Sequence, residues 1–180
     1  MTKAEFLIFA RLVVLVTFGL AAASKARDRD GFHKTIRDFK LASDARARVL
    51  VPLVILAETA IAVLVVSPDA AAVVGFSLAC AILALYTGIL GVARLKGSTV
   101  GCNCFGRSPT ELSWSDVGRN ILLLAIAGGG LWSALDRAAA PPAQVAGLFA
   151  AAGVAAVVVL VNLDAVVTTL RRPILVEEAQ

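Results

Sequence analysis

Residues 71–93, AAVVGFSLACAILALYTGILGVA, form an unbroken run without a charged side chain. A helix needs about 20 predominantly apolar residues to cross the roughly 30 Å hydrocarbon core of a bilayer. The run therefore predicts a transmembrane helix, and other runs of similar length and composition lie on both sides of it. This pattern sets the fold class that we expect for the whole chain.

The overall composition agrees with a membrane protein. Of the 180 residues, 59% are hydrophobic and 17% are charged, and the mean hydropathy is +0.85. Soluble domains are usually about 45–50% apolar. The pI near 9.3 would suggest nucleic-acid binding in a soluble protein, but here Lys and Arg lie between the apolar runs, as membrane topology requires. We predict an all-α fold, a polytopic transmembrane helical bundle, and no nucleic-acid partner.

We expect about five spans within a single integral membrane domain over residues 1–180. Their predicted ranges are 4–24, 49–67, 71–93, 117–135 and 145–170. The first range could instead be a cleavable signal peptide, but Glu5 and Arg11 interrupt the layout of such a peptide. In the fourth range the glycines at 128–130 would let neighbouring helices approach closely.

Two polar connections separate these spans. In residues 25–48, Phe32, Ile36 and Phe39 recur at helical spacing, which predicts a short helix lying in the membrane interface. The second connection, residues 94–115, holds two of the three cysteines and is called the cysteine loop below. Because alternate connections lie on the same side of a membrane, we expect the interfacial helix and the cysteine loop to share a face.

Within the cysteine loop, Cys102 and Cys104 are separated only by Asn103 and flanked by Gly101 and Gly106. A disulfide between them requires a tight turn, because its Cα atoms must lie about 4.4–6.8 Å apart. Asn and Gly accommodate such turns. A strained, exposed disulfide has the oxidising potential of an exchanging pair. We therefore interpret Cys102 and Cys104 as a redox-active pair.

Two other interpretations of this pair stay open. The thiolates could form half of a soft-metal site for Cu or Zn, which would need the distant Cys80 and His33 to complete four ligands. The cysteines could also be incidental in a structural subunit of a membrane complex. We assign no metal ligands, and we interpret Cys80, near the middle of a span, as a small buried hydrophobe.

Three charged residues are further site candidates. Arg119 lies on the cysteine side of the fourth span and could activate a thiolate, because a nearby cation lowers the pKa of a thiol; snorkelling to the interface is the competing explanation. Glu58 lies near the middle of the second span, where a carboxylate is costly unless it is paired or functional. We expect it to act as an intramembrane acid or base, or to form an ion pair with Arg11 on the first span.

The distribution of charge predicts an orientation. The first connection carries eight Lys and Arg residues, whereas the opposite side carries only Lys3 and Arg137. The positive-inside rule then puts the interfacial helix and the cysteine loop at the cytoplasmic face of the membrane.

Several residues together resemble the MauE branch of the MauE/DoxX-like membrane proteins, whose namesake belongs to methylamine utilisation. They are Lys25, Pro52, Glu58, the motif Cys102-Asn103-Cys104-Phe105-Gly106 and Arg119-Asn120. The family motif commonly has Gly where this chain has Asn103, an exchange that suits a position with positive φ. The resemblance implies a DoxX-like four-helix core followed by a C-terminal helix. It also implies a redox-associated membrane protein with a thioredoxin-like partner, and it sets the cysteines on the outer face.

The function that we expect is thiol–disulfide exchange through Cys102 and Cys104 in the plasma or inner membrane. Whether the chain is itself an oxidoreductase or an accessory subunit of one is open. We predict no cofactor. A quinone is compatible with such a protein, but no feature of the sequence supports a site for one. Soft-metal handling and a structural role are the alternatives.

Overall fold

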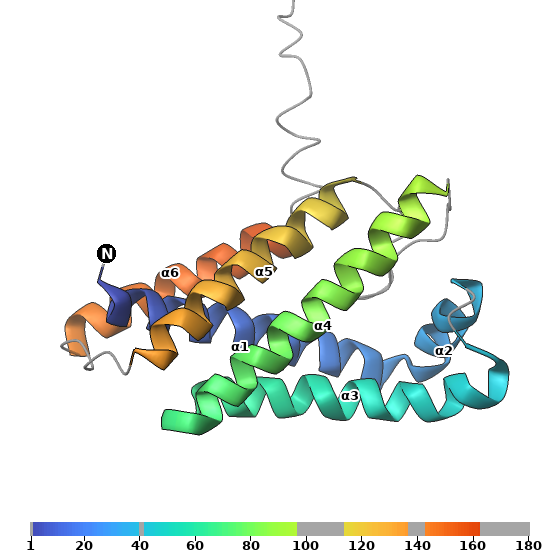
Figure 1. The fold of residues 1–180 in the computed structure, drawn as a ribbon, viewed down its shortest axis with the longest axis horizontal. Helices are drawn as coiled ribbons and strands as arrows, with labels where there is room; N and C mark the ends of the chain where they lie inside the picture. The colour runs from blue at the N-terminus through green and yellow to red at the C-terminus, as the bar shows by residue number, and fades with distance from the viewer. Residues whose placement is uncertain (1, 40–41, 97–113, 137–142, 163–180) are drawn as a thin grey trace, which may run out of the picture.

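The computed structural model describes residues 2–39, 42–96, 114–136 and 143–162. The described residues are almost entirely α-helical (Figure 1). In chain order the helices are α1 (Lys3–Arg27), α2 (Arg29–Asp38), α3 (Asp44–Val66), α4 (Asp69–Leu95), α5 (Trp114–Leu135) and α6 (Ala143–Val161). The predicted all-α helical bundle is confirmed.

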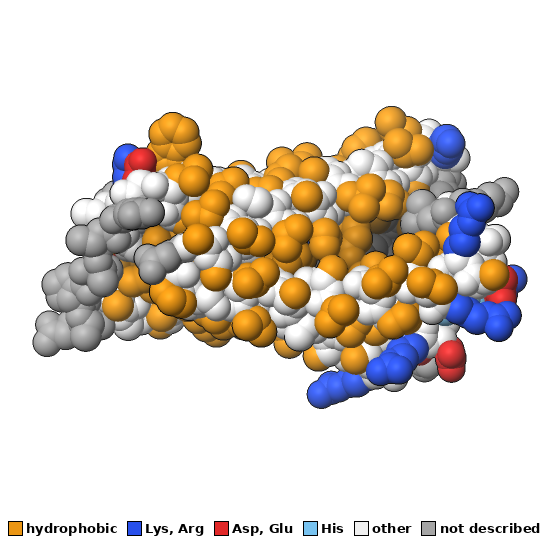
Figure 2. Space-filling model, turned by 60° about the horizontal axis from the view of Figure 1, so that its bottom comes forward, with side chains coloured by type: hydrophobic (Ala, Val, Ile, Leu, Met, Phe, Trp, Pro, Cys, Tyr) orange, Lys and Arg blue, Asp and Glu red, His pale blue; other side chains and the backbone are white. Residues whose placement is uncertain are grey.

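Four of these helices, α1, α3, α4 and α5, are long and apolar enough to cross a membrane, as predicted. In α6 the apolar stretch within the described residues is shorter, 146–160, and residues 163–170 of the predicted fifth span lie outside the described residues. Figure 2 shows hydrophobic side chains covering the middle of one face, with Lys and Arg gathered mainly toward the end that carries α2. The chain is an integral membrane protein.

The core lies where α1 meets the other helices. Helix α1 packs against α3, α5 and α6, and α4 packs against α3 and α5. Val13, Phe18, Ile61 and Phe76 belong to one buried cluster of this core. In lipid such packing, rather than a hydrophobic driving force, holds helices together.

Glycines permit two of the close approaches in this core. A Cβ added to Gly75 of α4 would lie 2.8 Å from the backbone nitrogen of Val65 in α3. A Cβ on Gly130 of α5 would lie 2.5 Å from the ring of Phe76. The glycine run at 128–130 therefore does bring helices together at Gly130, as its sequence predicts.

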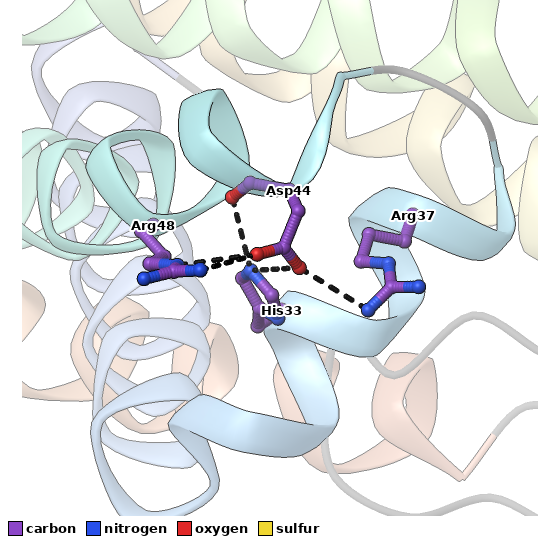
Figure 3. A network of polar contacts seen from close by, with 4 residues as sticks. All are labelled: His33, Arg37, Asp44 and Arg48. Atoms are coloured by element: carbon purple, nitrogen blue, oxygen red, sulfur yellow. Dashed lines mark hydrogen bonds and ion pairs between the residues drawn. The ribbon is translucent and has the colours of Figure 1, made fainter.

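Helix α2 is the short amphipathic helix expected from its pattern of apolar residues. Its buried Ile36 packs with Ala47 and Val51 of α3, so its apolar face covers α3. On its polar side, Asp44 begins α3 and accepts a hydrogen bond from Arg37 at 3.1 Å (Figure 3). The ring nitrogen Nε2 of His33 lies 3.6 Å from the same carboxylate. This contact network fixes α2 against the start of α3.

The two helices that flank the cysteine loop meet beside α2. Leu90 and Ala93 near the end of α4 form a buried cluster with Val117 near the start of α5. Phe39, directly after α2, packs against this cluster. The described residues on either side of the loop are thus held at the same end of the bundle as α2. The cysteine loop residues 97–113, including Cys102 and Cys104, lie outside the described residues.

Candidate functional site

The candidate site begins with Lys25, in the last turn of α1. Helix α1 buries one face, on which Val14, Phe18, Ala21 and Ala22 follow one another at helical spacing. Lys25 continues this face and is only 1% exposed. The helix ends two residues later, at Arg27, beyond the end predicted for the first span. An ammonium buried in this way requires a partner.

The partner is Glu58 of α3. Its carboxylate is fully buried and accepts hydrogen bonds from the Lys25 Nζ at 2.8 Å and 3.0 Å, one to each oxygen. Glu58 lies on the buried face of α3 with Val51, Ile61 and Val65. Charge-assisted hydrogen bonds of this kind offset the cost of burying both charges.

Tyr86 of α4 completes the cluster. Its hydroxyl donates a hydrogen bond to Glu58 Oε1 at 2.8 Å, and its ring centroid lies 5.7 Å from the Lys25 Nζ. The ring of Phe32 in α2 lies on the same ammonium, at 5.2 Å. Lys25, Glu58 and Tyr86, called the buried polar cluster below, therefore join α1, α3 and α4 at one depth. Such a cluster can hold and pass a proton among its three groups.

The ion-pair partner of Glu58 differs from the one that the sequence suggested. Arg11 was expected to lie at the depth of Glu58, but Lys25 occupies that position. The first turns of α3 pack against α2. Glu58 lies about 21 Å along α3 from its first residue at 1.5 Å per residue. Lys25, in the last turn of α1, therefore reaches Glu58, whereas Arg11 lies in the first half of α1.

Arg119 is buried in α5, where its Nη2 donates a hydrogen bond to Asp116 Oδ1 at 3.1 Å. The ion pair joins Arg119 to Asp116, one turn nearer the start of α5. Arg94, near the end of α4, lies 5.9 Å from the ring centroid of Trp114 at the start of α5. Two cations thus lie where the helices meet the cysteine loop. Activation of a thiolate by Arg119 stays a prediction, because both cysteines lie outside the described residues.

The remaining candidates behave as ordinary structural residues in the described part of the chain. Cys80 is partly buried and packs against the main core cluster, as expected for a small hydrophobe. His33 contacts Asp44, through its backbone oxygen at 3.4 Å and its carboxylate. Among the described residues, no group of three or more His, Cys, Asp or Glu side chains is arranged to hold a metal.

Sequence reasoning left Lys25 and Tyr86 out of the site, although a signal for both exists. Lys25 was assigned to the first polar connection, yet it follows Ala21 and Ala22 at helical spacing on the core face of α1. Tyr86 follows the buried Leu83 by three residues on the core face of α4. A polar residue that continues an apolar face is a sign of a buried partner.

Comparison with known proteins adds a family to this geometry. The family model described as methylamine utilisation protein MauE matches residues 3–133, a range that contains the buried polar cluster and the cysteine loop. The methylamine utilization protein MauE of Paracoccus denitrificans is 34% identical over 120 residues, which cover 65% of this chain and 63% of that protein. The chain therefore spans less than two thirds of the length of this relative. No solved structure matches the chain.

Proposed function

The chain belongs to the family of the methylamine utilisation protein MauE, and on this premise we propose that it exchanges disulfides with a thioredoxin-like partner through Cys102 and Cys104. We extend to it the association with methylamine utilisation that the family name carries. In this proposal the helical bundle presents the cysteine loop at one rim of the membrane.

The observation that carries the proposal is the packing of the two helix ends that bound the cysteine loop. Leu90 and Ala93 of α4 are buried with Val117 of α5. This cluster anchors both ends of the loop at the end of the bundle where Lys and Arg are concentrated. In the proposal, the loop between these two helix ends meets its soluble partner at the membrane surface.

The charges next to the loop support thiolate chemistry. Arg94 and Arg119 lie on the two helices that meet the loop. A cation near a thiol favours the thiolate, which is the attacking species in disulfide exchange. Because Arg119 is also paired with Asp116, we expect Arg94 to contribute at least as much positive potential to the loop.

The proposed exchange proceeds in two steps. A partner thiolate attacks one sulfur of the Cys102–Cys104 disulfide, breaks that bond and forms a mixed disulfide with the chain. The second partner thiolate then attacks the mixed disulfide, so the partner leaves as a disulfide and the chain keeps both cysteines as thiols. Two electrons and two protons pass from the partner to the chain, and the reverse reaction oxidises the chain.

Variants with one cysteine test this proposal, because they stop the exchange at the mixed disulfide. In a Cys80→Ser background, Cys102→Ser and Cys104→Ser are each incubated with a thioredoxin whose second cysteine is replaced and whose remaining cysteine is held as a mixed disulfide with thionitrobenzoate, which leaves when the thiolate of the chain attacks the thioredoxin sulfur. We expect one of the two variants to form a covalent complex that a reductant separates. If neither variant forms it while both insert normally into membranes, the exchange proposal is wrong.

A further inference from the structure

A groove of about 240 Å³ lies between α2, the first half of α3 and the second half of α4. Leu50 and Val54 of α3 form one of its walls, and Leu85 and Ile89 of α4 form another. The groove is larger than the cavity of about 150 Å³ that holds a benzene ring. It therefore has room for a segment of a hydrocarbon chain.

The polar residues that line the groove keep their polar atoms on partners within the protein. Lys25 and Tyr86 donate hydrogen bonds to Glu58. The hydroxyl of Thr35 donates to the backbone oxygen of Gly31 at 3.0 Å. No other polar residue lines the groove in the described part of the chain. Because a polar group that entered would lose its hydrogen bonds with water, the part of an occupant inside the groove must be hydrocarbon.

The groove opens toward the lipid side of the bundle. Leu50 and Leu85 line it, and these two side chains are 36% and 60% exposed. Both belong to helices long and apolar enough to cross a membrane. The hydrocarbon chain of a bilayer lipid therefore reaches the groove directly.

A cation follows each of these two walls, toward the end of the bundle that carries α2. Arg46 is four residues before Leu50, so the two side chains lie on the same face of α3. The apolar run of α3 begins only at Val49, so Arg46 lies at the level of the lipid headgroups when Leu50 lies in hydrocarbon. Lys96, directly after α4, follows Ile89 by seven residues and so continues the wall on that helix.

The charges of these two cations are not neutralised by the described part of the protein. Arg46 and Lys96 are exposed, and neither forms an ion pair with a described acidic side chain. Arg37 and Arg48, by contrast, both contact Asp44. Arg46 and Lys96 are therefore available to an anion from outside the protein.

We propose that this groove binds one acyl chain of an anionic phospholipid, whose phosphate lies at the level of Arg46 and Lys96. Apolar walls in hydrocarbon, followed by cations nearer the membrane surface, match the order of acyl chain and phosphate in such a lipid. Each Lys or Arg near the surface favours an anionic over a neutral lipid by about fivefold. The proposal concerns lipid binding alone and holds whether or not the cysteines exchange disulfides.

The first test concerns the headgroup. Native mass spectrometry of the full chain in detergent measures binding of dioleoyl-phosphatidylglycerol, with dioleoyl-phosphatidylcholine as the zwitterionic lipid that has the same chains. Arg46→Gln removes the cation next to the α3 wall. Lys34→Gln is the matched control, because Lys34 is two residues from both Phe32 and Ile36, which line the groove, and so lies on the other side of α2.

We expect phosphatidylglycerol to bind about fivefold more tightly than phosphatidylcholine, or more. Arg46→Gln should weaken the binding of phosphatidylglycerol about fivefold, and Lys34→Gln should leave it unchanged. Equal losses in the two variants would show a diffuse effect of net charge and overturn the proposal. Equal binding of the two lipids would overturn it as well.

The second test concerns the acyl chain. Val54 lines the groove, so Val54→Phe fills part of it. Val63 of the same helix is 58% exposed and does not line the groove, which makes Val63→Phe the matched control. We expect Val54→Phe to weaken the binding of phosphatidylglycerol about tenfold and Val63→Phe to leave it unchanged. Soluble glycerol phosphate, which has the headgroup without the chains, should not displace the lipid. Unchanged binding in Val54→Phe, or displacement by glycerol phosphate, would contradict an acyl chain in the groove.

Discussion

The ammonium of Lys25 lies 2.8 Å from one carboxylate oxygen of Glu58, and the two side chains are 1% and 0% exposed. Lys25 is near the end of α1, and Glu58 is in the second half of α3. The ion pair therefore fixes how far α3 extends past α1. The first turns of α3 are covered by α2.

Removing one member of this pair should destabilise the bundle strongly. Glu58→Gln leaves the Lys25 ammonium buried without a counter-ion, and a broken buried pair typically costs about 3–5 kcal/mol. The joint change Glu58→Gln and Lys25→Met should recover most of this loss. Thermal unfolding in detergent, followed by circular dichroism, measures both effects.

A control separates Lys25 from the partner that the sequence suggested. Glu58→Gln combined with Arg11→Gln should be no more stable than Glu58→Gln alone. If the change at Arg11 rescues stability and the change at Lys25 does not, the pairing described here is incorrect.

Much of this fold follows from the sequence because lipid imposes a simple requirement on it. Every backbone polar group in hydrocarbon must be satisfied internally, so each long apolar run must be a helix. The four runs that gave α1, α3, α4 and α5 were predicted for this reason. The amphipathic helix α2 was also predicted, from the spacing of Phe32 and Ile36.

The depth of one helix against another did not follow from the sequence. The predicted start of the second span was residue 49, whereas α3 begins at Asp44, because Arg48 and Arg37 pair with Asp44 and extend the helix beyond the apolar run. Glu58 pairs with Lys25 rather than with the expected Arg11 for the same reason, because the apolar runs do not fix how far α3 extends past α1.

Tyr86→Phe should have a smaller effect than loss of the ion pair. The change removes the hydroxyl that donates to Glu58 at 2.8 Å and keeps the ring beside Lys25. A hydrogen bond to a charged group contributes about 1.5–3 kcal/mol, so we expect a loss in that range. A change in stability near zero, measured by the same unfolding experiment, would show that the hydroxyl does not support the carboxylate.

The close approach of α3 and α4 should make Gly75 intolerant of a side chain. A Cβ at this position would lie 2.8 Å from the backbone nitrogen of Val65, so Gly75→Ala must push the helices apart. We expect a loss of about 1–3 kcal/mol, as for other overpacked positions. Gly88 of the same helix has open space around its Cβ position. Gly88→Ala should therefore be neutral or stabilising, and equal losses at both positions would contradict the packing.

The two ends of α1 should be accessible from opposite sides of the membrane. Thr2 lies at its start, and Lys34 of the adjacent α2 lies beyond its end; both are exposed. In a Cys80→Ser background, Thr2→Cys and Lys34→Cys should react with a membrane-impermeant thiol reagent from opposite sides. Both variants also carry Cys102→Ser and Cys104→Ser, so that the introduced cysteine is labelled alone. In a separate chain that keeps Cys102 and Cys104 and has no introduced cysteine, these two cysteines should react from the same side as Lys34→Cys. Labelling of the loop cysteines from the side of Thr2→Cys would contradict the prediction that α2 and the cysteine loop lie on the same side of the membrane.

Electron transfer through the loop tests the central claim most directly. The chain with oxidised Cys102 and Cys104, reconstituted in nanodiscs, is mixed with reduced thioredoxin, and the thiols of both proteins are counted over time. We predict that one thioredoxin dithiol is lost for each pair of thiols gained by the chain, and that the joint change Cys102→Ser and Cys104→Ser abolishes the exchange while Cys80→Ser preserves it. Thioredoxin that stays reduced beside the oxidised chain, or exchange that persists without Cys102 and Cys104, would contradict the account.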